Sequence, residues 1–251
     1  MSLNSIYRFS SRVDNYVRFR PSYPTQILET LNRDCGLTRD SVIADIASGT
    51  GIFTKLLLEH GNRVFGVEPN AEMRRAGEQF LADYPNFTSV TGTAEATTLE
   101  PRCVDFVTAA QAGHWFDRQK SRQEFSRILK SGGWAVLVWN ERKTDSTPFL
   151  RDYEDLLMHY GTDYNEVRHE HTVVGEFFDP LAFQERTFDL QQIFDYTGVE
   201  GRLMSSSYAP GPGHPNQTPM LRELRAIFDR HQHDGTVSVE YTTRMFYGQL
   251  A

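Results

Sequence analysis

Short apolar runs alternate with amphipathic segments through the first 140 residues of the chain. The apolar runs predict five strands, at Val42–Ala47, Arg63–Val67, Phe87–Thr91, Val104–Ala110 and Trp134–Trp139. Runs of this length, bounded by turn residues, are typical of strands that are buried on both faces of a parallel sheet. Because strands that alternate with helices form right-handed βα units, the pattern predicts a sheet with helices on both faces.

Residues that cap helices mark the segments between these strands. The predicted helices are Thr50–His60, stopped by Gly61; Ala71–Ala82, capped by Asn70; and a segment after Asp117 that continues to Lys130 and ends at Gly132–Gly133. Asn and Asp side chains accept hydrogen bonds from free helix N–H groups, and glycine adopts the left-handed conformation that ends a helix. An earlier helix is predicted to begin near Ser22–Pro24 and to carry the apolar stripe Ile27, Leu28 and Leu31.

The pattern is less regular after Asn140. It predicts helices at Thr147–Tyr160 and Thr218–His231, strands at Thr187–Phe194 and Val237–Tyr247, and a loop at Ser205–Pro215. Two late strands joined in this way form an antiparallel edge on a parallel sheet. The sequence therefore predicts an α/β fold with a seven-stranded, mostly parallel sheet and an antiparallel C-terminal edge strand.

Composition narrows the class of protein. The 251 residues are 39% hydrophobic and 24% charged, as in a globular protein with an ample core. The net charge of −7 disfavours nucleic acid as a partner. No apolar run reaches the ~18 residues of a membrane span, and residues 1–11 contain no signal-peptide core. Two cysteines without metal or redox spacing fit a cytoplasmic protein.

The turn after the first strand carries the first candidate chemistry. Gly49 and Gly51 let the backbone approach a ligand, and Asp45 lies at the end of the strand. A carboxylate at this place opposes a pyrophosphate but favours a ligand with an ammonium and a sulfonium, such as S-adenosylmethionine. Thr54 stands where a dinucleotide fingerprint has its third Gly or Ala, and no phosphate-binding Gly-Lys-Ser/Thr occurs. A tight turn without a ligand is the alternative interpretation.

Glu68 ends the second predicted strand, about 20 residues after Asp45. An acidic side chain at this position accepts hydrogen bonds from ribose hydroxyls in nucleotide-binding folds. The alternative is a solvated turn residue, which its place between an apolar strand and a capped helix disfavours.

Several motifs occur together in a characteristic order. They are Asp45–Gly51, Glu68–Met73, Gly92–Glu95, Ala109–Trp115 and Leu129–Ala135. In order and spacing they resemble the class I S-adenosylmethionine-dependent methyltransferases over roughly residues 10 to 140. Arg20–Pro24 and the Gln-Ala-x-His-Trp run resemble the small-molecule branch that includes trans-aconitate methyltransferase-like proteins. The resemblance implies a Rossmann-like fold with an N-terminal helical lid, and S-adenosylmethionine as the cofactor.

The resemblance also implies roles for individual residues. Asp45, Ala47, Gly49 and Gly51 would hold the methionine end of the cofactor, and Glu68 and Pro69 the ribose. Met73, Thr93, Ala94 and Glu95 would surround the adenine, and Gln111 would line the cofactor. Two positions depart from the family pattern, because Ala47 replaces the usual first glycine and Thr93 stands where an acidic residue is frequent. The resemblance divides one domain into an arm and lid helix at 1–34, a cofactor-binding core at 35–141, and substrate-side helices with the last strands at 142–251.

The segment after the fourth predicted strand should face the transferred methyl group. Its sequence lacks the Asn/Asp-Pro-Pro-aromatic motif of base N-methyltransferases, which favours a small-molecule acceptor. Trp115, Trp139 and Tyr208 are candidate acceptor-binding residues, with core packing as the alternative. His114 is the candidate general base for a hydroxyl acceptor. A carboxylate acceptor needs no base, because it is already ionised and the sulfonium is already activated.

The N-terminal arm interleaves aromatic residues with arginines. If Tyr16 to Arg20 is helical, these two side chains share a face and can cover the cofactor and pair with a carboxylate. A surface helix with solvated arginines is the alternative. The clusters His169–His171 and His231–Asp234 lie in polar segments far from the motifs, so we expect no metal.

Three functional hypotheses follow. The favoured one is a methyltransferase that moves the methyl group of S-adenosylmethionine to oxygen, in particular a carboxylate, of a small acceptor by direct in-line displacement without metal. The second is a nicotinamide-dependent oxidoreductase. The third is a catalytically silent domain that binds S-adenosylmethionine or a partner. The sequence leaves open the acceptor, the alkylated element and the oligomeric state.

Overall fold

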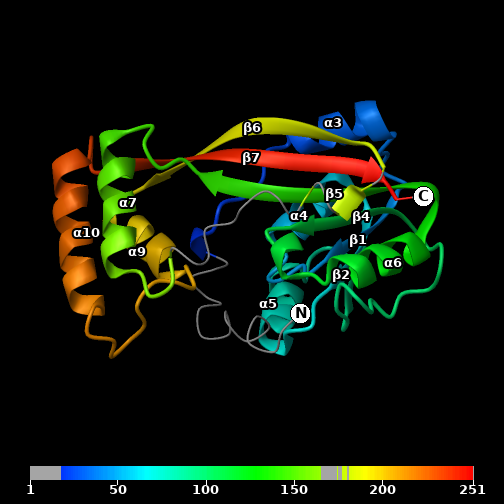
Figure 1. The fold of residues 1–251 in the computed structure, drawn as a ribbon, viewed down its shortest axis with the longest axis horizontal. Helices are drawn as coiled ribbons and strands as arrows, with labels where there is room; N and C mark the ends of the chain where they lie inside the picture. The colour runs from blue at the N-terminus through cyan, green and yellow to red at the C-terminus, as the bar shows by residue number, and fades with distance from the viewer. Residues whose placement is uncertain (1–17, 165–173, 175–176, 180, 251) are drawn as a thin grey trace.

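The computed structural model describes residues 18–164, 174, 177–179 and 181–250. One mixed sheet runs through the molecule, with the strand order β3-β2-β1-β4-β5-β7-β6 (Figure 1). The strands are β1 Val42–Ile46, β2 Arg63–Val67, β3 Phe87–Val90, β4 Val104–Ala110, β5 Leu129–Arg142, β6 Phe183–Phe194 and β7 Val237–Gln249. The predicted α/β fold with seven strands is confirmed.

The first five strands are parallel to one another, and β7 is antiparallel to both of its neighbours. The C-terminal strand β7 lies between β5 and β6, so β6 forms the outer edge. These three strands are much longer than the rest and reach well beyond the parallel core, which Figure 1 shows as a ribbon extending to the left. Their free ends carry the helices that follow β5 and β6.

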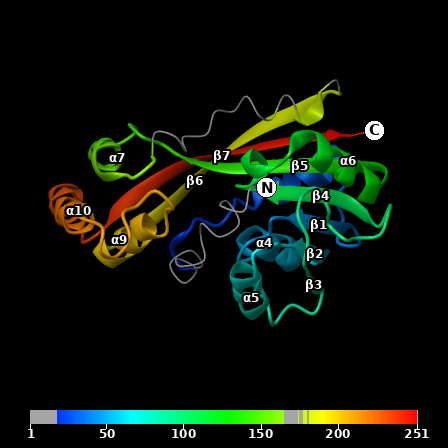
Figure 2. The same ribbon diagram turned by 60° about the horizontal axis from the view of Figure 1, so that its bottom comes forward.

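Helices cover both faces of the parallel core (Figure 2). The helices of the core are α3 Gln26–Cys35, α4 Ile52–His60, α5 Ala71–Phe80 and α6 Arg118–Ile128. Side chains of α3 and α4 share one apolar cluster with Val136 of β5, whereas α6 packs in a second cluster with Leu137. Neighbouring residues of β5 thus enter opposite layers, as the two-residue period of a strand requires.

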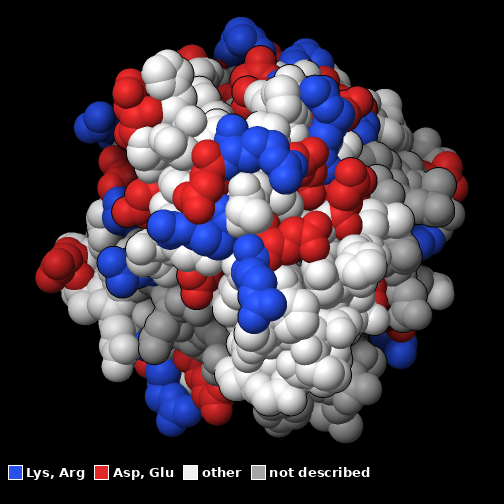
Figure 3. All heavy atoms as spheres, turned by 90° about the vertical axis from the view of Figure 1, so that its left-hand side faces the viewer, with Lys and Arg blue, Asp and Glu red and all other residues white. Residues whose placement is uncertain are grey.

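A third apolar cluster lies at the far end of the long strands. It joins α7 Pro148–Tyr160, α9 Tyr196–Met204 and α10 Gln217–His231, here called the helical cap, to the start of β7. Positive and negative side chains interleave on the outer surface of this end of the molecule (Figure 3). Exposed ion pairs such as Arg225–Asp229 and Arg230–Asp152 belong to it.

Two elements of the structure differ from the prediction. The helix that begins after Asp117 ends at Ile128, not at Lys130, and Gly132–Gly133 lie within β5 instead of ending the helix. A Cβ at Gly133 would come within 2.9 Å of the Asp105 carbonyl oxygen, so this glycine serves close strand packing. Helix α9 was not predicted at all. Its sequence contains Gly198 and Gly201, which are poor helix formers.

Candidate active site

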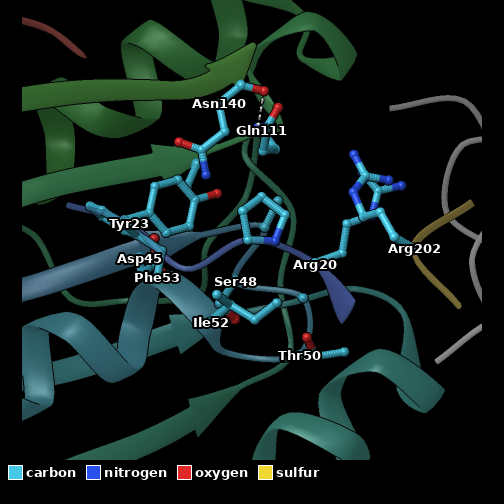
Figure 4. Close-up of a pocket in the computed structure, with 14 residues that line it drawn as sticks. Arg20, Tyr23, Asp45, Ser48, Thr50, Ile52, Phe53, Gln111, Asn140 and Arg202 are labelled. Atoms are coloured by element: carbon cyan, nitrogen blue, oxygen red, sulfur yellow. Dashed lines mark hydrogen bonds between the residues drawn. The ribbon is translucent and has the colours of Figure 1, made fainter. Parts of the chain in front are cut away.

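A pocket of about 550 Å³ opens at the carboxyl ends of the central strands. Open α/β sheets bind ligands at this edge, where the strand order reverses between β1 and β4. The pocket is lined by residues of the β1 and β4 ends, of α4, of the segment before α3, of β5 and of α9: Arg20, Pro21, Tyr23, Asp45, Ala47, Ser48, Gly49, Thr50, Ile52, Phe53, Ala110, Gln111, Asn140 and Arg202. Figure 4 shows the principal side chains.

The loop between β1 and α4 forms the floor of the pocket. Ala47, Gly49 and Gly51 all have positive φ angles, of 55°, 58° and 84°. This left-handed conformation explains the two glycines, and it shows why the family pattern has a glycine where this chain has Ala47. The Gly49 N–H donates to Glu68 over 2.9 Å, which joins the loop to the end of β2.

Asp45 lies at the end of β1 and is 1% exposed. Thr54 and Thr108 donate hydroxyl hydrogen bonds to its two oxygens, at 2.6 and 2.9 Å. Burial raises the pKa of Asp45 to about 6, although the two threonine hydrogen bonds oppose the rise. No basic side chain of the described residues forms an ion pair with it. Asp45 is therefore a buried carboxyl group that a cationic ligand in the pocket would stabilise in its ionised form.

Glu68 follows β2 and is 7% exposed. Its carboxylate accepts hydrogen bonds from the backbone N–H groups of Gly49 and Asn70, at 2.9 and 2.8 Å. Burial raises its pKa, against the effect of both hydrogen bonds. Glu68 does not line the pocket, although it supports the loop that does. Each carboxylate oxygen keeps a second lone pair, so Glu68 can still accept the predicted hydrogen bonds from ribose hydroxyls.

Gln111 and Asn140 form the wall between β4 and β5. Gln111 also has a positive φ, of 58°, and its side chain donates to the Asn140 carbonyl oxygen over 3.0 Å. The Asn140 amide donates to the Ser22 carbonyl and accepts from the Thr243 hydroxyl. Asn140 therefore fastens the segment before α3 to the sheet beside the pocket. Sequence reasoning missed this role, because a single Asn at a strand end carries no motif.

Two arginines stand on the side of the pocket opposite Tyr23, Asp45 and Phe53 (Figure 4). Arg20 comes from the segment before α3 and donates to the Ser205 carbonyl over 3.0 Å. Arg202 comes from α9 and is 6% exposed. Arg20 is a predicted site residue, whereas Arg202 was missed together with its helix.

The remaining predicted residues lie outside the pocket lining. His114 and Trp115 sit on the short 3-10 helix η2, Gly113–Trp115, with their rings 4.5 Å apart. Trp139 packs edge-on against Phe246 in the core, and Tyr208 packs against Tyr164 in the cap. The pocket lining also lacks the residues expected around the adenosine, which are Pro69, Met73, Thr93, Ala94 and Glu95. Met73 contacts the loop between β1 and α4, because its Cε lies 3.4 Å from the position of a Cβ on Gly49.

Tyr16, His169 and His171 lie outside the described residues. Within the described ranges, no group of three or more His, Cys, Asp or Glu side chains is arranged to hold a metal ion. None of the helices in that part of the chain has the length and apolar character needed to cross a membrane.

Comparison with known families agrees with this arrangement. Residues 44–137, which run from β1 into β5, match the methyltransferase domain family. This chain carries a class I methyltransferase domain. The domain contains Asp45, the glycine loop, Glu68 and Gln111, whereas Arg20 and Arg202 lie outside it.

Relatives with curated descriptions extend beyond the methyltransferase domain. An uncharacterized methyltransferase of Mycobacterium tuberculosis is 34% identical over 169 residues, which are 67% of this chain and 65% of the relative. An uncharacterized methyltransferase-like protein of Schizosaccharomyces pombe is 31% identical over 156 residues, which are 62% of this chain and 59% of the relative. The matches thus span less than two thirds of the length of these relatives.

Solved structures share the fold over most of the chain. A protein of Anaeromyxobacter dehalogenans, described as a type II methyltransferase, has a TM-score of 0.70 at 22% identity and covers 92% of this chain and 98% of its own. One of Anabaena variabilis, described as a methyltransferase from an antibiotic biosynthesis pathway, has a TM-score of 0.66 at 24% identity with the same coverage. At these identities the likeness concerns the fold.

Proposed function

We propose that this chain is an S-adenosylmethionine-dependent methyltransferase that methylates an oxygen, in particular a carboxylate oxygen, of a small molecule. S-adenosylmethionine is the cofactor that the methyltransferase domain implies. The observation that carries the proposal is the place of Asp45, a buried carboxyl group without a cationic partner among the described residues, in a pocket formed by that domain.

The residues of the pocket fit this cofactor. A carboxylate beside the glycine loop suits the ammonium of the methionine end, and Arg20 suits its carboxylate. Glu68, Pro69 and Met73 with the Thr93–Glu95 turn are the proposed adenosine contacts.

The bound cofactor supplies an activated methyl group on a sulfonium. The chain's own residues position the reactants and exclude water. Gln111 is held rigid by its bond to Asn140, and Tyr23 packs edge-on against Phe53 at 4.8 Å to form an apolar wall. A carboxylate acceptor needs no base, so His114 has no necessary role in that reaction. For a hydroxyl acceptor, His114 remains the candidate base.

Other features support the finer parts of the proposal. A net charge of −7 and an interleaved charge pattern on the cap argue against a nucleic acid acceptor (Figure 3). Cys35 and Cys103 are free, which agrees with a cytoplasmic enzyme. The trans-aconitate methyltransferase-like branch and the acceptor roles of Trp115, Trp139 and Tyr208 stay predictions.

Calorimetry tests the cofactor assignment. The wild-type chain should bind S-adenosylhomocysteine but not NAD or NADP. Asp45→Ala and Glu68→Ala should each weaken that binding by about 100-fold or more, because each removes a buried hydrogen-bonding carboxylate. Asp229→Asn, on the exposed face of α10, is the matched control and should change nothing. Unchanged affinity in both pocket variants, or tighter binding of a dinucleotide, would overturn the proposal.

A further inference from the structure

Arg202 is a buried cation without an acidic partner in the part of the chain that the structure describes. Its guanidinium donates from Nε to the Tyr241 hydroxyl and from Nη1 to the Ser206 hydroxyl, both at 3.0 Å. No carboxylate of the described residues forms an ion pair with it. Arginine is almost never buried unless it is paired, because removing its charge from water is unfavourable without a compensating charge. A ligand is the natural source of the missing negative charge.

The hydrogen bonds of Arg202 fix the direction of its guanidinium. Tyr241 accepts from Arg202 and donates its own hydroxyl hydrogen to Gln192 over 3.0 Å, so its oxygen is committed. Gly201 has no side chain, and a Cβ there would lie 2.2 Å from the ring of Phe19. The segment before α3 therefore packs directly on α9 next to Arg202. Arg202 lines the pocket and keeps N–H donors that the two hydroxyls do not use.

By contrast, the neighbouring Arg142 is satisfied within the cap. It forms an ion pair with Glu154 and a 3.0 Å hydrogen bond with the Tyr164 hydroxyl. The pKa of Tyr208 reflects the net positive charge of this region. Burial opposes its ionisation, but the charges of Arg202, Arg20 and Arg142 outweigh burial and hold the pKa of Tyr208 below its ordinary value.

The charge of the cofactor adds to the imbalance at Arg202. S-adenosylmethionine carries one carboxylate against an ammonium and a sulfonium, so it brings one net positive charge into the pocket. Asp45, when ionised, can balance this added charge but not the charge of Arg202 as well. A neutral acceptor would leave Arg202 without a counter-charge from the described residues that line the pocket, whereas an anionic acceptor supplies one.

We propose that Arg202 binds a carboxylate of the methyl acceptor and so selects acidic acceptors, while Arg20 serves the carboxylate of the cofactor. This inference rests on the proposed methyltransferase function and adds a specificity-determining residue outside the matched domain. Arg202 is suited to the role because its fork can bind a carboxylate through two parallel hydrogen bonds.

The test compares acids with uncharged analogues. The full-length protein is assayed for transfer of labelled methyl from S-adenosylmethionine to a panel of aliphatic and aromatic mono- and dicarboxylic acids, and to the corresponding amides and phenols. In parallel, thermal unfolding of the protein saturated with S-adenosylhomocysteine is measured with each compound, which detects binding without turnover. The wild type should prefer acids in both measurements. Equal response to acids and amides, or no response to any acid while S-adenosylhomocysteine binds, would overturn the role of Arg202.

Variants then assign the preference to the residue. Arg202→Gln should raise KM for the preferred acid by about 30-fold or more and leave the affinity for S-adenosylhomocysteine within about threefold. Arg202→Lys keeps the positive charge but lacks the planar guanidinium fork. Its KM for the preferred acid should therefore lie between those of the wild type and Arg202→Gln. Arg225→Gln, an exposed arginine of the cap, should match the wild type. A purely structural role predicts an unchanged KM.

Loss of S-adenosylhomocysteine binding in Arg202→Gln that equals the loss of acid binding would assign Arg202 to the cofactor and overturn the inference. That outcome leaves the proposed function standing. Failure of the wild type to bind S-adenosylhomocysteine removes the proposed function itself, so the two failures are distinguishable. The thermal midpoint of each variant without ligand excludes misfolding as the cause.

Discussion

The two walls of the pocket carry opposite charges and are built in different ways. The wall of the parallel core presents Asp45 from the end of a short, fully buried strand. The opposite wall presents Arg202 from a glycine-containing helix held at the end of the three long strands. Both charges are buried, and neither has an ion-pair partner among the described residues.

The two walls show how a regular βα scaffold can be combined with a separately built charged wall. The core wall follows from regular βα geometry, which brings strand ends and a glycine loop to one edge. The cap wall depends on the lengths of β5, β6 and β7, which place α9 across the pocket from β1. If the proposed roles hold, we expect changes in the cap to alter acceptor binding and to leave the proposed cofactor site undisturbed.

The first prediction contrasts a paired buried carboxylate with the unpaired Asp45. Glu154 forms an ion pair with Arg142, and the two side chains are only 13% and 9% exposed. Glu154→Gln should lower the free energy of unfolding by about 3–4 kcal/mol, because it leaves Arg142 buried without its counter-charge. Urea unfolding at pH 7.5 measures it.

Asp229→Asn is the control for Glu154→Gln, since it removes an exposed helical ion pair that contributes about 0.5 kcal/mol or less. If Glu154→Gln lowers the free energy of unfolding no more than this control does, the stability of the cap does not depend on the Glu154–Arg142 ion pair. The contrast between Arg142, which has an acidic partner, and Arg202, which has none among the described residues, then loses its energetic basis.

The second prediction concerns Asp45, whose neutralisation should raise the free energy of unfolding instead of lowering it. Burial raises its pKa to about 6 in the folded protein from an ordinary value of 3.8, so the folded state holds this proton more tightly than the unfolded state. The stability that it contributes is present below about pH 4 and is lost as the pH rises through 6. The loss amounts to about 2–3 kcal/mol.

Asp45→Asn should abolish this pH dependence and be more stable than the wild type at pH 7.5, while it binds S-adenosylhomocysteine poorly. The variant keeps groups that can bond Thr54 and Thr108. The measurement is the difference in unfolding free energy between wild type and variant from pH 4 to pH 8, which cancels the other titrating groups. A difference that does not change with pH contradicts the raised pKa.

The third prediction compares two glycines with nearly the same conformation in the two regions. Gly51 of the cofactor loop has φ 84°, and Gly213 of the loop before α10 has φ 85°. A Cβ at Gly51 would lie 2.6 Å from Leu81 Cδ1, whereas nothing lies within 4 Å at Gly213. Gly51→Ala should cost about 2 kcal/mol and Gly213→Ala about 1 kcal/mol, because both pay for the left-handed backbone but only the first repacks a neighbour.

Thermal unfolding of the two variants measures this difference. If Gly51→Ala and Gly213→Ala lose equal amounts of unfolding free energy, the Leu81 side chain moves away from the new methyl group without cost. Gly51→Ala should also weaken S-adenosylhomocysteine binding, since the loop carries the proposed methionine contacts. Gly213→Ala should leave that binding unchanged.

The two regions also differ in how far their sequence predicts them. Strands β2 and β4 match the predicted limits, because each is an apolar run bounded by polar or turn residues. Gly132 and Gly133 of β5 lead to the prediction of a helix end, and the two glycines of α9 disfavour the prediction of a helix. Gly133, Gly198 and Gly201 allow close packing, since a Cβ at each would come within 3 Å of a neighbouring atom. Asp45 could be identified from its motif. Arg202 could not, since its role depends on tertiary distance from β1 and no local pattern marks it.

The smallest predicted effect tests the departure of Ala47 from the family pattern. Ala47 has a φ of 55°, a conformation that costs a non-glycine residue about 1 kcal/mol. Ala47→Gly removes this cost but increases the entropy of the unfolded chain, so the variant should be more stable by less than about 1 kcal/mol. Its affinity for S-adenosylhomocysteine should stay within about twofold, because the backbone already has the glycine geometry.

Ala44→Gly, three residues earlier and within β1, is the matched control for Ala47→Gly. Ala44 is fully buried in β1 and gains nothing from glycine, so this variant should lose about 1 kcal/mol or more. If the backbone at Ala47 is strained, urea unfolding should show that the free energy of unfolding rises in Ala47→Gly and falls in Ala44→Gly. Equal destabilisation would show that the first position of the loop is relaxed with alanine, and that the glycine of the family pattern serves the approach of the ligand instead of the backbone angle.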